Sequence, residues 1–378
     1  MKITYITNAR IPTEKAHGYQ ICKMCEEFSR AGADVELIVP TRKNPIRDSA
    51  FNYYGLKNNF KIRYIKSPDF LRFDKFLFKK AIYLNNLFFL IKSFFIKIDR
   101  KNFIYSRSPE MSWIFSVRGY KTFFEAHIYP GSKKIIFDFF LKKVNIVTIT
   151  QGIKNVFVER GFDEKKIFVS PDAVDFEKFN LEISKNDARE KVNLPSDKKI
   201  IMYTGSFYIW GWKGVDLLIE LSKNISNEFL FVLVGGSKSD LEKNDNKNSN
   251  LLLVEKVSHD IVPYYLKSAD VLILPNKKGD IISEYYTSPL KLFEYMASGV
   301  PIVASSLPSI KEILNKENSF LFEANNVNDL LEKINFVLEN KYEAEKRANK
   351  SYEDVKKYTW KERASLILCF LNNFYQKN

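Results

Sequence analysis

Histidine and cysteine are scarce in this sequence, with three of each among 378 residues. Cys22 and Cys25 form a Cys-x-x-Cys pair, yet a zinc site needs four ligands, and only Cys369 and the three histidines remain to supply two more. The pair instead shares helical spacing with the apolar Ile21 and Phe28, and free cysteine behaves as a small buried hydrophobe. We therefore expect a structural pair, with no metal site and no disulfide framework, as in a reducing cytoplasm.

Long apolar runs are also missing. No stretch approaches about 18 uninterrupted apolar residues, so no transmembrane helix is expected. Met1 and Lys2 lead directly into a strand pattern, and no signal peptide is expected either. Because 378 residues exceed one ordinary hydrophobic core, we expect two domains, and a hydrophobic content of 45% is enough to fill both.

The formal net charge of +14 is unevenly distributed. Residues 1–175 carry the whole excess, whereas residues 176–378 hold equal numbers of basic and acidic side chains. This asymmetry indicates an anionic partner for the first domain only, either a membrane surface or nucleic acid. Phe73–Lys101 is rich in aromatic and basic residues. Two interpretations stay open for it: a core helix with a solvated lysine side, or an amphipathic surface that dips into a bilayer.

Apolar strand patterns alternate with helical stretches in both halves of the chain. The strands expected in the first half are Lys2–Thr7, Val35–Val39, Phe60–Ile65, Phe103–Tyr105, Lys121–Glu125 and Asn145–Thr150. Those expected in the second half are Ile200–Tyr203, Phe229–Val234, Leu251–Leu253, Val271–Leu274 and Pro301–Ala304. Repeated βα units predict α/β architecture with parallel sheets covered by helices, here as two doubly wound domains.

The most informative segment is Ala269–Ser305, which reads as strand, polar loop, helix and strand. Ser288 and Pro289 stand where a helix has its N-cap and first residue, and Gly299 ends that helix. The helix N-terminus would therefore direct N–H groups into the preceding loop, where an anion such as a diphosphate can bind. Glu294 lies six residues after Ser288 in the same helix, so its side chain could reach the part of the ligand next to that anion.

A second segment supports an anion site in the same half of the chain. Lys198–Ile219 runs from a strand through a glycine-containing loop into a helix. Lys213 and Gly214 stand at the entrance of that helix, and a lysine suits a phosphate because it is a compact charge on a flexible stem.

Eight segments together resemble glycosyltransferase family 4, the retaining enzymes of GT-B fold. Four resemble its donor-binding domain: YTGSFYIWGWKGVDLLI, FVLVGG, YYLKSADVLILP and SPLKLFEYMASGVPIVAS. The others are RIPTEKAHGYQICKMCEEFSRAGADVELIVP (first loop and helix), FFEAHIYP (histidine motif), VSPDAVDFEKF (interdomain segment) and YTWKERASLIL (a helix that crosses back to the first domain).

The resemblance implies a GT-B fold with two Rossmann-like domains facing a cleft. Residues 1–174, completed by helix 359–378, would bind the acceptor, and residues 175–358 would bind the donor. The implied enzyme is a retaining glycosyltransferase that moves a hexose-type sugar from a UDP- or GDP-linked donor to a glycan or lipid-linked acceptor in cell-surface polysaccharide or glycolipid synthesis. It would be cytoplasmic, peripheral on the inner membrane face, and without a cofactor or metal.

The resemblance also implies roles for individual residues. The catalytic candidates are His127 at the transferred sugar, Lys213 at the phosphates and Glu294 at the ribose. The donor-binding candidates are Gly18, Gly205, Lys213, Val257, Ser258, Tyr286, Ser288, Leu290 and Glu294. The candidates for contact with acceptor or donor, or for orienting the site, are His17, Arg107 and Glu125.

Two departures from the family pattern affect the donor site. The family often carries two glutamates separated by seven residues, but only the second, Glu294, is present, and Tyr286 occupies the place of the first. The family also usually has an arginine shortly before the Lys-Gly pair, and none lies between Gly205 and Lys213. Lys213 is then the one side-chain cation that the sequence indicates in this half of the site.

Two other functions stay open. A sugar-nucleotide epimerase could share the two-domain architecture, although the combination of Lys213 and Glu294 favours transfer. A basic nucleic-acid-binding protein would account for the charge of +14, but the sequence has no recognised nucleic-acid module, and this function leaves the donor motifs unexplained.

Overall fold

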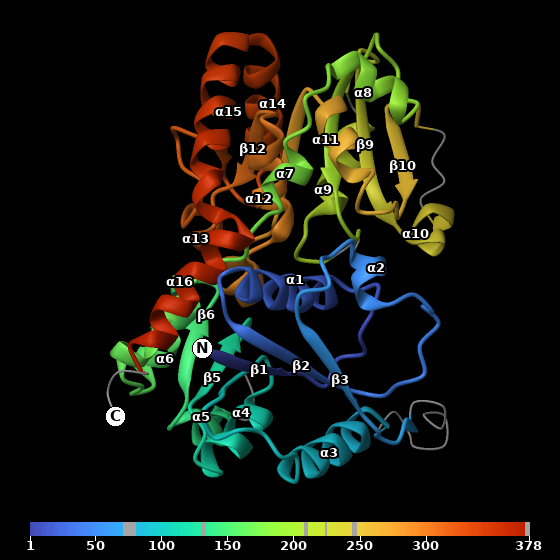
Figure 1. The fold of residues 1–378 in the computed structure, drawn as a ribbon. Coiled ribbons are helices and arrows are strands. Elements are labelled where there is room, and N and C mark those ends of the chain that lie inside the picture. The colour runs from blue at the N-terminus through green and yellow to red at the C-terminus, as the bar shows by residue number, and fades with distance from the viewer. Residues whose placement is uncertain (71–80, 130–133, 208–210, 224, 244–247, 375–378) are drawn as a thin grey trace. The chain divides into compact units, whose positions relative to one another are not determined.

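Two parallel β-sheets organise the computed structural model (Figure 1). The structure describes residues 1–70, 81–129, 134–207, 211–223, 225–243 and 248–374. The chain forms two compact units. The first holds Met1–Ile149, Ile153–Ser170 and Trp360–Asn378, and the second holds Thr150–Gly152 and Pro171–Thr359.

The first unit contains a seven-stranded sheet with the order β3-β2-β1-β4-β5-β6-β7. Its strands are β1 (Lys2–Ile6), β2 (Asp34–Pro40), β3 (Lys61–Ile65), β4 (Phe103–Ser106), β5 (Thr122–Ala126), β6 (Asn145–Thr148) and β7 (Ile167–Val169). Its helices are α1 (Ala16–Arg30), α2 (Ala50–Tyr54), α3 (Ala81–Phe94), α4 (Pro109–Val117), α5 (Lys134–Leu141), α6 (Gln151–Glu159, whose first two residues belong to the second unit), a 3-10 turn (Glu164–Lys166) and α16 (Trp360–Asn372).

Helix α1 and the C-terminal helix α16 both pack within the first unit. The buried Phe28 of α1 lies against Tyr105 of β4, with 5.6 Å between ring centroids. Phe370 of α16 stacks on Phe168 of β7 at 5.2 Å. Tyr19 and Trp360 join the two helices edge to face at 6.3 Å. The C-terminal helix α16 is therefore part of the first unit.

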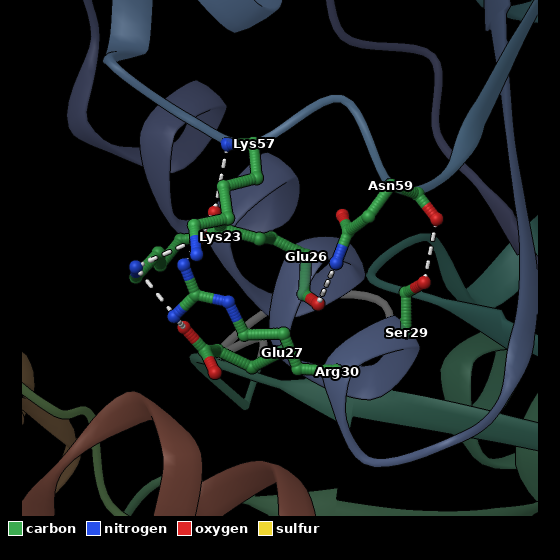
Figure 2. A network of polar contacts seen from close by, with 7 residues as sticks. All are labelled: Lys23, Glu26, Glu27, Ser29, Arg30, Lys57 and Asn59. Carbon is green, nitrogen blue, oxygen red and sulfur yellow. Dashed lines mark hydrogen bonds and ion pairs between the residues drawn. The ribbon is translucent and has the colours of Figure 1, made fainter.

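A network of charged and polar side chains fixes α1 to the segment before β3 (Figure 2). Glu26 and Glu27 are almost fully buried, and Lys23 and Arg30 lie within 3.0 Å of their carboxylate oxygens. Further hydrogen bonds from the network involve Ser29, Lys57 and Asn59. Because two cations neutralise the two buried carboxylates, this cluster is a structural feature of α1.

The second unit contains a six-stranded sheet with the order β10-β9-β8-β11-β12-β13. Its strands are β8 (Lys199–Thr204), β9 (Phe229–Gly236), β10 (Leu251–Glu255), β11 (Val271–Leu274), β12 (Ile302–Ser305) and β13 (Phe320–Phe322). Its helical segments are α7 (Phe176–Phe179), α8 (Lys185–Lys191), α9 (Val215–Ser222), α10 (Lys238–Lys243), α11 (Val262–Ser268), a π-helical turn (Ile282–Tyr286), α12 (Leu290–Ser298), α13 (Pro308–Lys311), α14 (Val327–Glu339), α15 (Lys341–Val355) and a 3-10 turn (Lys356–Tyr358).

Alternate residues of β8 enter two hydrophobic cores, one on each face of this sheet. Ile200 and Met202 belong to one core, and Ile201 and Tyr203 belong to the other. A strand that is buried on both faces reads as a continuous apolar run, which is the pattern in the sequence.

Each sheet reverses its direction of winding at one point. In the first unit this point lies between β1 and β4, and in the second unit it lies between β8 and β11. Ligands of open parallel sheets bind outside the carboxyl ends of the strands at such a point. The topology therefore specifies one candidate site in each unit.

The structure confirms the α/β class with two parallel-sheet domains and corrects several local predictions. Helix α12 begins at Leu290, and Pro289 is its N-cap. The hydroxyl of Ser288 does not cap this helix, because it accepts a hydrogen bond from the backbone N–H of Asp172 at 2.9 Å. Part of the expected polar loop before it is the π-helical turn Ile282–Tyr286.

Helix α3 covers only part of the basic aromatic segment, whose residues 73–80 lie outside the described residues. Phe89 is fully buried, whereas Phe88, Phe94 and Phe95 are exposed. The segment thus contributes to the core and also presents apolar side chains to solvent. Among the described helices, none is both long and apolar enough to cross a membrane.

Candidate functional site

Two lysines converge at the carboxyl end of β8 in the second unit. Lys291, in the first turn of α12, places its Nζ 3.6 Å from the ring centroid of Tyr203. A Cβ atom on Gly205 would lie 2.6 Å from the same Nζ, so a larger residue there would displace the end of the lysine side chain. Burial, and then the neighbouring Lys213, hold the pKa of Lys291 well below its usual range. Burial also lowers the pKa of Lys213. Two cations so close together favour an anionic ligand.

The position of Lys213 depends on the glycine that follows it. Gly214 has a φ of 68°, and a Cβ there would lie 1.8 Å from the carbonyl oxygen of Pro275, which follows β11. The α9 entrance can therefore approach the end of β11 closely. Lys213 donates a hydrogen bond to Ser206 Oγ, in the loop that follows β8. This arrangement directs the lysine to the point where the sheet reverses its winding.

A carboxylate and an imidazole lie beside the two lysines. Glu294 is three residues after Lys291 and therefore on the same side of α12. Its Oε1 is 3.0 Å from Nε2 of His259, which follows Val257 and Ser258 in the segment after β10. The ring of His259 packs against Phe179 at 5.3 Å. The site therefore joins an anion-binding part to a part that can accept hydrogen bonds from hydroxyl groups.

The structure brings Gly205, Lys213 and Glu294 together, and it adds two residues that the sequence reasoning missed. Lys291 corrects the prediction of a single cation. The sequence feature that could have identified it is its position in the first turn of the expected helix. His259 is one of only three histidines and directly follows Ser258.

The remaining donor-site candidates of this unit lie around α12. Tyr286 is buried at the end of the π-helical turn. Ser288 bonds to Asp172, and Leu290 is the first residue of α12. Their roles toward a ligand stay predictions.

Glu125 is the centre of a buried network at the end of β5 in the first unit. Its Oε1 lies 2.6 Å from Nε2 of His127, and its Oε2 accepts hydrogen bonds from Tyr105 Oη at 2.5 Å and Arg363 Nη1 at 3.4 Å. Burial opposes the charged carboxylate, but Arg363 and His127 outweigh it and hold the pKa of Glu125 well below its usual range. The ionised carboxylate fixes the orientation of the His127 ring. Arg363 lies on α16, and its role was not expected.

The sequence predicts a loop as far as Gly18, but the structure places both His17 and Gly18 in the first turn of α1. A Cβ on Gly18 would lie 2.2 Å from Tyr54 Oη, so packing within the first unit already requires glycine there. Burial, then Arg107 and Lys15, lower the pKa of His17 to about 4. The imidazole is therefore neutral at neutral pH.

His17 and Arg107 both line a cavity of about 840 Å³ in the first unit. The cavity lies at the carboxyl ends of β1, β2 and β4, where this sheet reverses its winding. It is thus the first unit's counterpart of the lysine site.

The structure also shows the surroundings of the cysteine pair and the grouping of possible metal ligands. Cys22 and Cys25 are free and fully buried in α1, and burial raises the pKa of both thiols. Within the described parts of the chain, no three His, Cys, Asp or Glu side chains are grouped so that they could hold a metal ion.

Comparison with known proteins identifies the fold. The chain resembles sucrose-phosphate synthase from Thermosynechococcus elongatus with a TM-score of 0.75 and 16% identity, over 100% of both chains. It resembles HepE of Anabaena, solved in complex with UDP, with a TM-score of 0.74 and 13% identity, over 99% of this chain and 100% of that one. The chain has the GT-B fold.

Sequence comparison connects the GT-B second unit to glycosyltransferases. Residues 198–340, less than half of the chain, match the family described as Glycosyl transferases group 1. The chain is 30% identical over 200 residues to UDP-Gal:alpha-D-GlcNAc-diphosphoundecaprenol alpha-1,3-galactosyltransferase of Escherichia coli, which covers 50% of this chain and 48% of that protein. It spans about half the length, or less, of the curated relatives it matches.

Proposed function

We propose that this GT-B protein is a glycosyltransferase that uses a nucleoside-diphosphate sugar bound in the second unit. The observation that carries the proposal is the convergence of Lys213 and Lys291 at Gly205, beside the pair formed by Glu294 and His259. These five residues all lie within the segment that matches Glycosyl transferases group 1. HepE, which shares the fold, has been solved with UDP and with UDP-glucose.

In the proposed reaction, the bond between the anomeric carbon and the diphosphate oxygen breaks, and an acceptor hydroxyl oxygen forms the new bond to that carbon. The hydroxyl proton passes to the departing diphosphate. The two lysines stabilise the negative charge that grows on the leaving group, which is the main electrostatic task of such an enzyme. With the diphosphate on the face that the acceptor approaches, the configuration is retained.

We also propose ligand contacts for the other candidate residues. Glu294, held by His259, would accept hydrogen bonds from ribose hydroxyls, and the backbone of Val257 and Ser258 would contact the base. His127, oriented by Glu125, would contact the transferred sugar. We propose a UDP- or GDP-linked hexose as the donor.

The relatives and the exposed side chains of α3 support a proposal for the acceptor and for the cellular location. The Escherichia coli relative is named for a diphosphoundecaprenol-linked acceptor. We propose a glycan or lipid-linked acceptor, in polysaccharide or glycolipid synthesis at the cytoplasmic face of the membrane. The exposed aromatic side chains of α3 support a peripheral association with anionic lipid.

Nucleotide binding tests the proposal. We expect UDP or GDP to raise the melting temperature of the wild-type protein, because a ligand at about 100 times its Kd stabilises by about 2.7 kcal/mol. The shift should shrink in Lys291→Ala and persist in Lys346→Ala, a matched change at an exposed lysine of α15. Absence of any shift with either nucleotide would contradict the proposal, and donor isomerisation without acceptor would favour an epimerase instead.

A chelator tests the proposed independence from metal. Since two lysines supply the charge for the diphosphate, sugar transfer should continue in EDTA. Complete loss of transfer that Mn²⁺ restores would show that the lysines are insufficient.

A further inference from the structure

Arg363 of α16 is almost completely buried, with 3% of its surface accessible. A buried cation is costly unless it is paired and hydrogen-bonded. Two hydrogen bonds of its guanidinium meet this need: Nη1 donates to Glu125 Oε2 at 3.4 Å, and Nη2 donates to the carbonyl oxygen of Ser170 at 3.3 Å. We propose that Arg363 is a positioning residue for sugar transfer, which acts on His127 through Glu125. The proposal rests on the proposed glycosyltransferase function.

The two carboxylate oxygens of Glu125 have different partners. Oε2 accepts hydrogen bonds from Arg363 and from Tyr105 Oη at 2.5 Å, whereas Oε1 lies 2.6 Å from Nε2 of His127. Glu125 lies on the face of β5 that α16 covers, since Phe123, two residues earlier, packs against a phenylalanine of that helix with 6.0 Å between ring centroids. Arg363 therefore holds one oxygen of the carboxylate from α16 while the other oxygen faces the histidine.

Arg363 is a permanent, hydrogen-bonded charge beside Glu125. Burial raises the pKa of this carboxyl, but Arg363, His127 and Arg107 outweigh burial and hold the pKa well below its usual range. The charge of an arginine is permanent, whereas a histidine loses its charge as pH rises. Arg107 is more distant, with its Nε 4.0 Å from Oε1, and its Nη1 donates to Gln20 Oε1. Three other titratable side chains lie near Glu125 and stay neutral, because burial raises their pKa values: Tyr5, Tyr105 and Cys25.

The charge state of Glu125 decides which nitrogen of His127 carries the proton. An ionised carboxylate only accepts hydrogen bonds, so at 2.6 Å it selects the form of the neutral ring that is protonated at Nε2. Without the charge of Arg363, the buried carboxyl would take up a proton at higher pH, and a protonated carboxyl can donate to the same nitrogen instead. The ring would then present no single proton pattern to the transferred sugar. Arg363 thus influences the histidine through the carboxylate that both contact.

The position of Arg363 in the chain adds a second link. The chain leaves the first unit after Ser170 and returns to it at Trp360, three residues before Arg363. Because Nη2 of Arg363 donates to the carbonyl oxygen of Ser170, the same guanidinium joins both crossing points to Glu125. Docking of α16 is therefore a condition for the geometry at His127, and not only for the stability of the fold.

A double-mutant cycle tests whether Arg363 acts through Glu125. Nucleotide release from UDP-glucose, or from GDP-glucose if GDP is the nucleotide that binds, is measured for the wild type, Arg363→Met, Glu125→Gln and the double variant. We expect each single change to lower kcat at least tenfold with the donor KM within twofold. In the Glu125→Gln background, Arg363→Met should change kcat less than twofold, because the charge that it acts on is already gone.

Two results of this cycle would overturn the proposal: wild-type kcat in Arg363→Met, or effects that multiply in the double variant. If Arg363→Met does not fold, the comparison of Glu125→Gln with the double variant still decides, since the proposal requires similar kcat values there. Arg363→Lys keeps the charge and should recover part of the lost kcat.

Histidine NMR reads the same link without a donor sugar. The chain has three histidines, so ¹⁵N-histidine labelling of the full chain gives three sets of imidazole signals, which single His→Gln variants assign. Because removal of a cation raises the pKa values of the acid and the base beside it, the signals of His127 should titrate at higher pH in Arg363→Met than in the wild type. They should stay near the wild-type pH in Arg363→Lys. The signals of His259, in the second unit, should not move.

A change on the same helix separates charge from packing. Phe370→Leu weakens the contact of α16 with Phe168 but leaves every charge around Glu125, so it should lower the melting temperature and leave the His127 titration unchanged. An equal shift of the titration in Phe370→Leu and Arg363→Met, or an unchanged titration in Arg363→Met, would overturn the proposal. Failure of the wild type to release nucleotide from either sugar would instead overturn the proposed function, and the NMR titrations would not depend on it.

Discussion

The two units each have a candidate site at the same point of a parallel sheet, but they supply different cations there. The second unit uses Lys213 and Lys291, whose pKa values burial lowers. The first unit uses arginines, above all Arg42 and Arg107, beside the apolar side chains of α3. Lysine can change its protonation when an anion binds, whereas arginine stays charged. One topology thus provides a compact site with two lysines in the second unit and a wider cavity lined by arginines and apolar side chains in the first.

The largest effect is expected at Lys213. Because this lysine stabilises charge that grows on the leaving diphosphate, Lys213→Ala should lower kcat more than it raises the KM for the donor. Loss of a charge-assisted hydrogen bond costs about 1.5–3 kcal/mol, which is roughly 10- to 150-fold in kcat/KM. Steady-state kinetics measure it, with Lys346→Ala as the control. A folded Lys213→Ala with wild-type kcat/KM would place the donor site elsewhere.

Glu294→Ala should act on binding more than on the chemical step. Its carboxylate is assigned to a part of the donor that does not change in the reaction, so the donor KM should rise by about tenfold while kcat changes less. The same kinetic assay measures it. The opposite result, a fall in kcat with an unchanged KM, would move Glu294 to the reacting centre.

A pair of glycine variants separates steric exclusion from backbone strain in the second unit. Gly205 and Gly279 both have positive φ, but only at Gly205 would a Cβ meet Lys291 Nζ, whereas the surroundings of Gly279 are open within 4 Å. Both alanine variants should lose about 1–2 kcal/mol of unfolding free energy. Only Gly205→Ala should also weaken UDP binding, by severalfold. Equal UDP affinity in the two variants would show that Lys291 does not need the space at Gly205.

The smallest expected effect concerns acid stability of the first unit. The folded pKa of Glu125 lies below its unfolded value, so its contribution to stability is present above the unfolded pKa and is lost as pH falls through the folded one. Below about pH 4.5, the free energy of unfolding of Glu125→Gln should therefore fall less steeply with decreasing pH than that of the wild type. Denaturant melts across this range measure it, and parallel curves would contradict the charge assignment.

The sequence predicted the elements that are long or strongly patterned. Strand Val271–Leu274 has the predicted bounds, and helix Val215–Ser222 begins directly after Lys213 and Gly214 as predicted. Strands β7 and β13 have three residues each, too few for a period to be visible. The helix start at Ser288 was wrong because a hydroxyl that could cap a helix instead bonds to Asp172, a partner 116 residues away.

The candidate site shows the same division between local and distant signals. Lys213 and Glu294 follow from local motifs. Lys291 was missed because its contact with Tyr203 arises only when β8 and β11 become neighbours and α12 returns over them. Arg363 is separated from Glu125 by 238 residues, and no local pattern could connect the two.

Proton uptake on UDP binding tests the two-lysine site most directly. Titration calorimetry at mildly alkaline pH, in two buffers with different ionisation enthalpies, measures the protons taken up per UDP bound. Since the pKa of Lys291 is held low in the free protein and an anion raises it, the wild type should take up protons, and its UDP affinity should fall as pH rises. Lys291→Ala should bind UDP more weakly and take up fewer protons. Equal affinity and equal proton uptake in the two proteins would contradict the account.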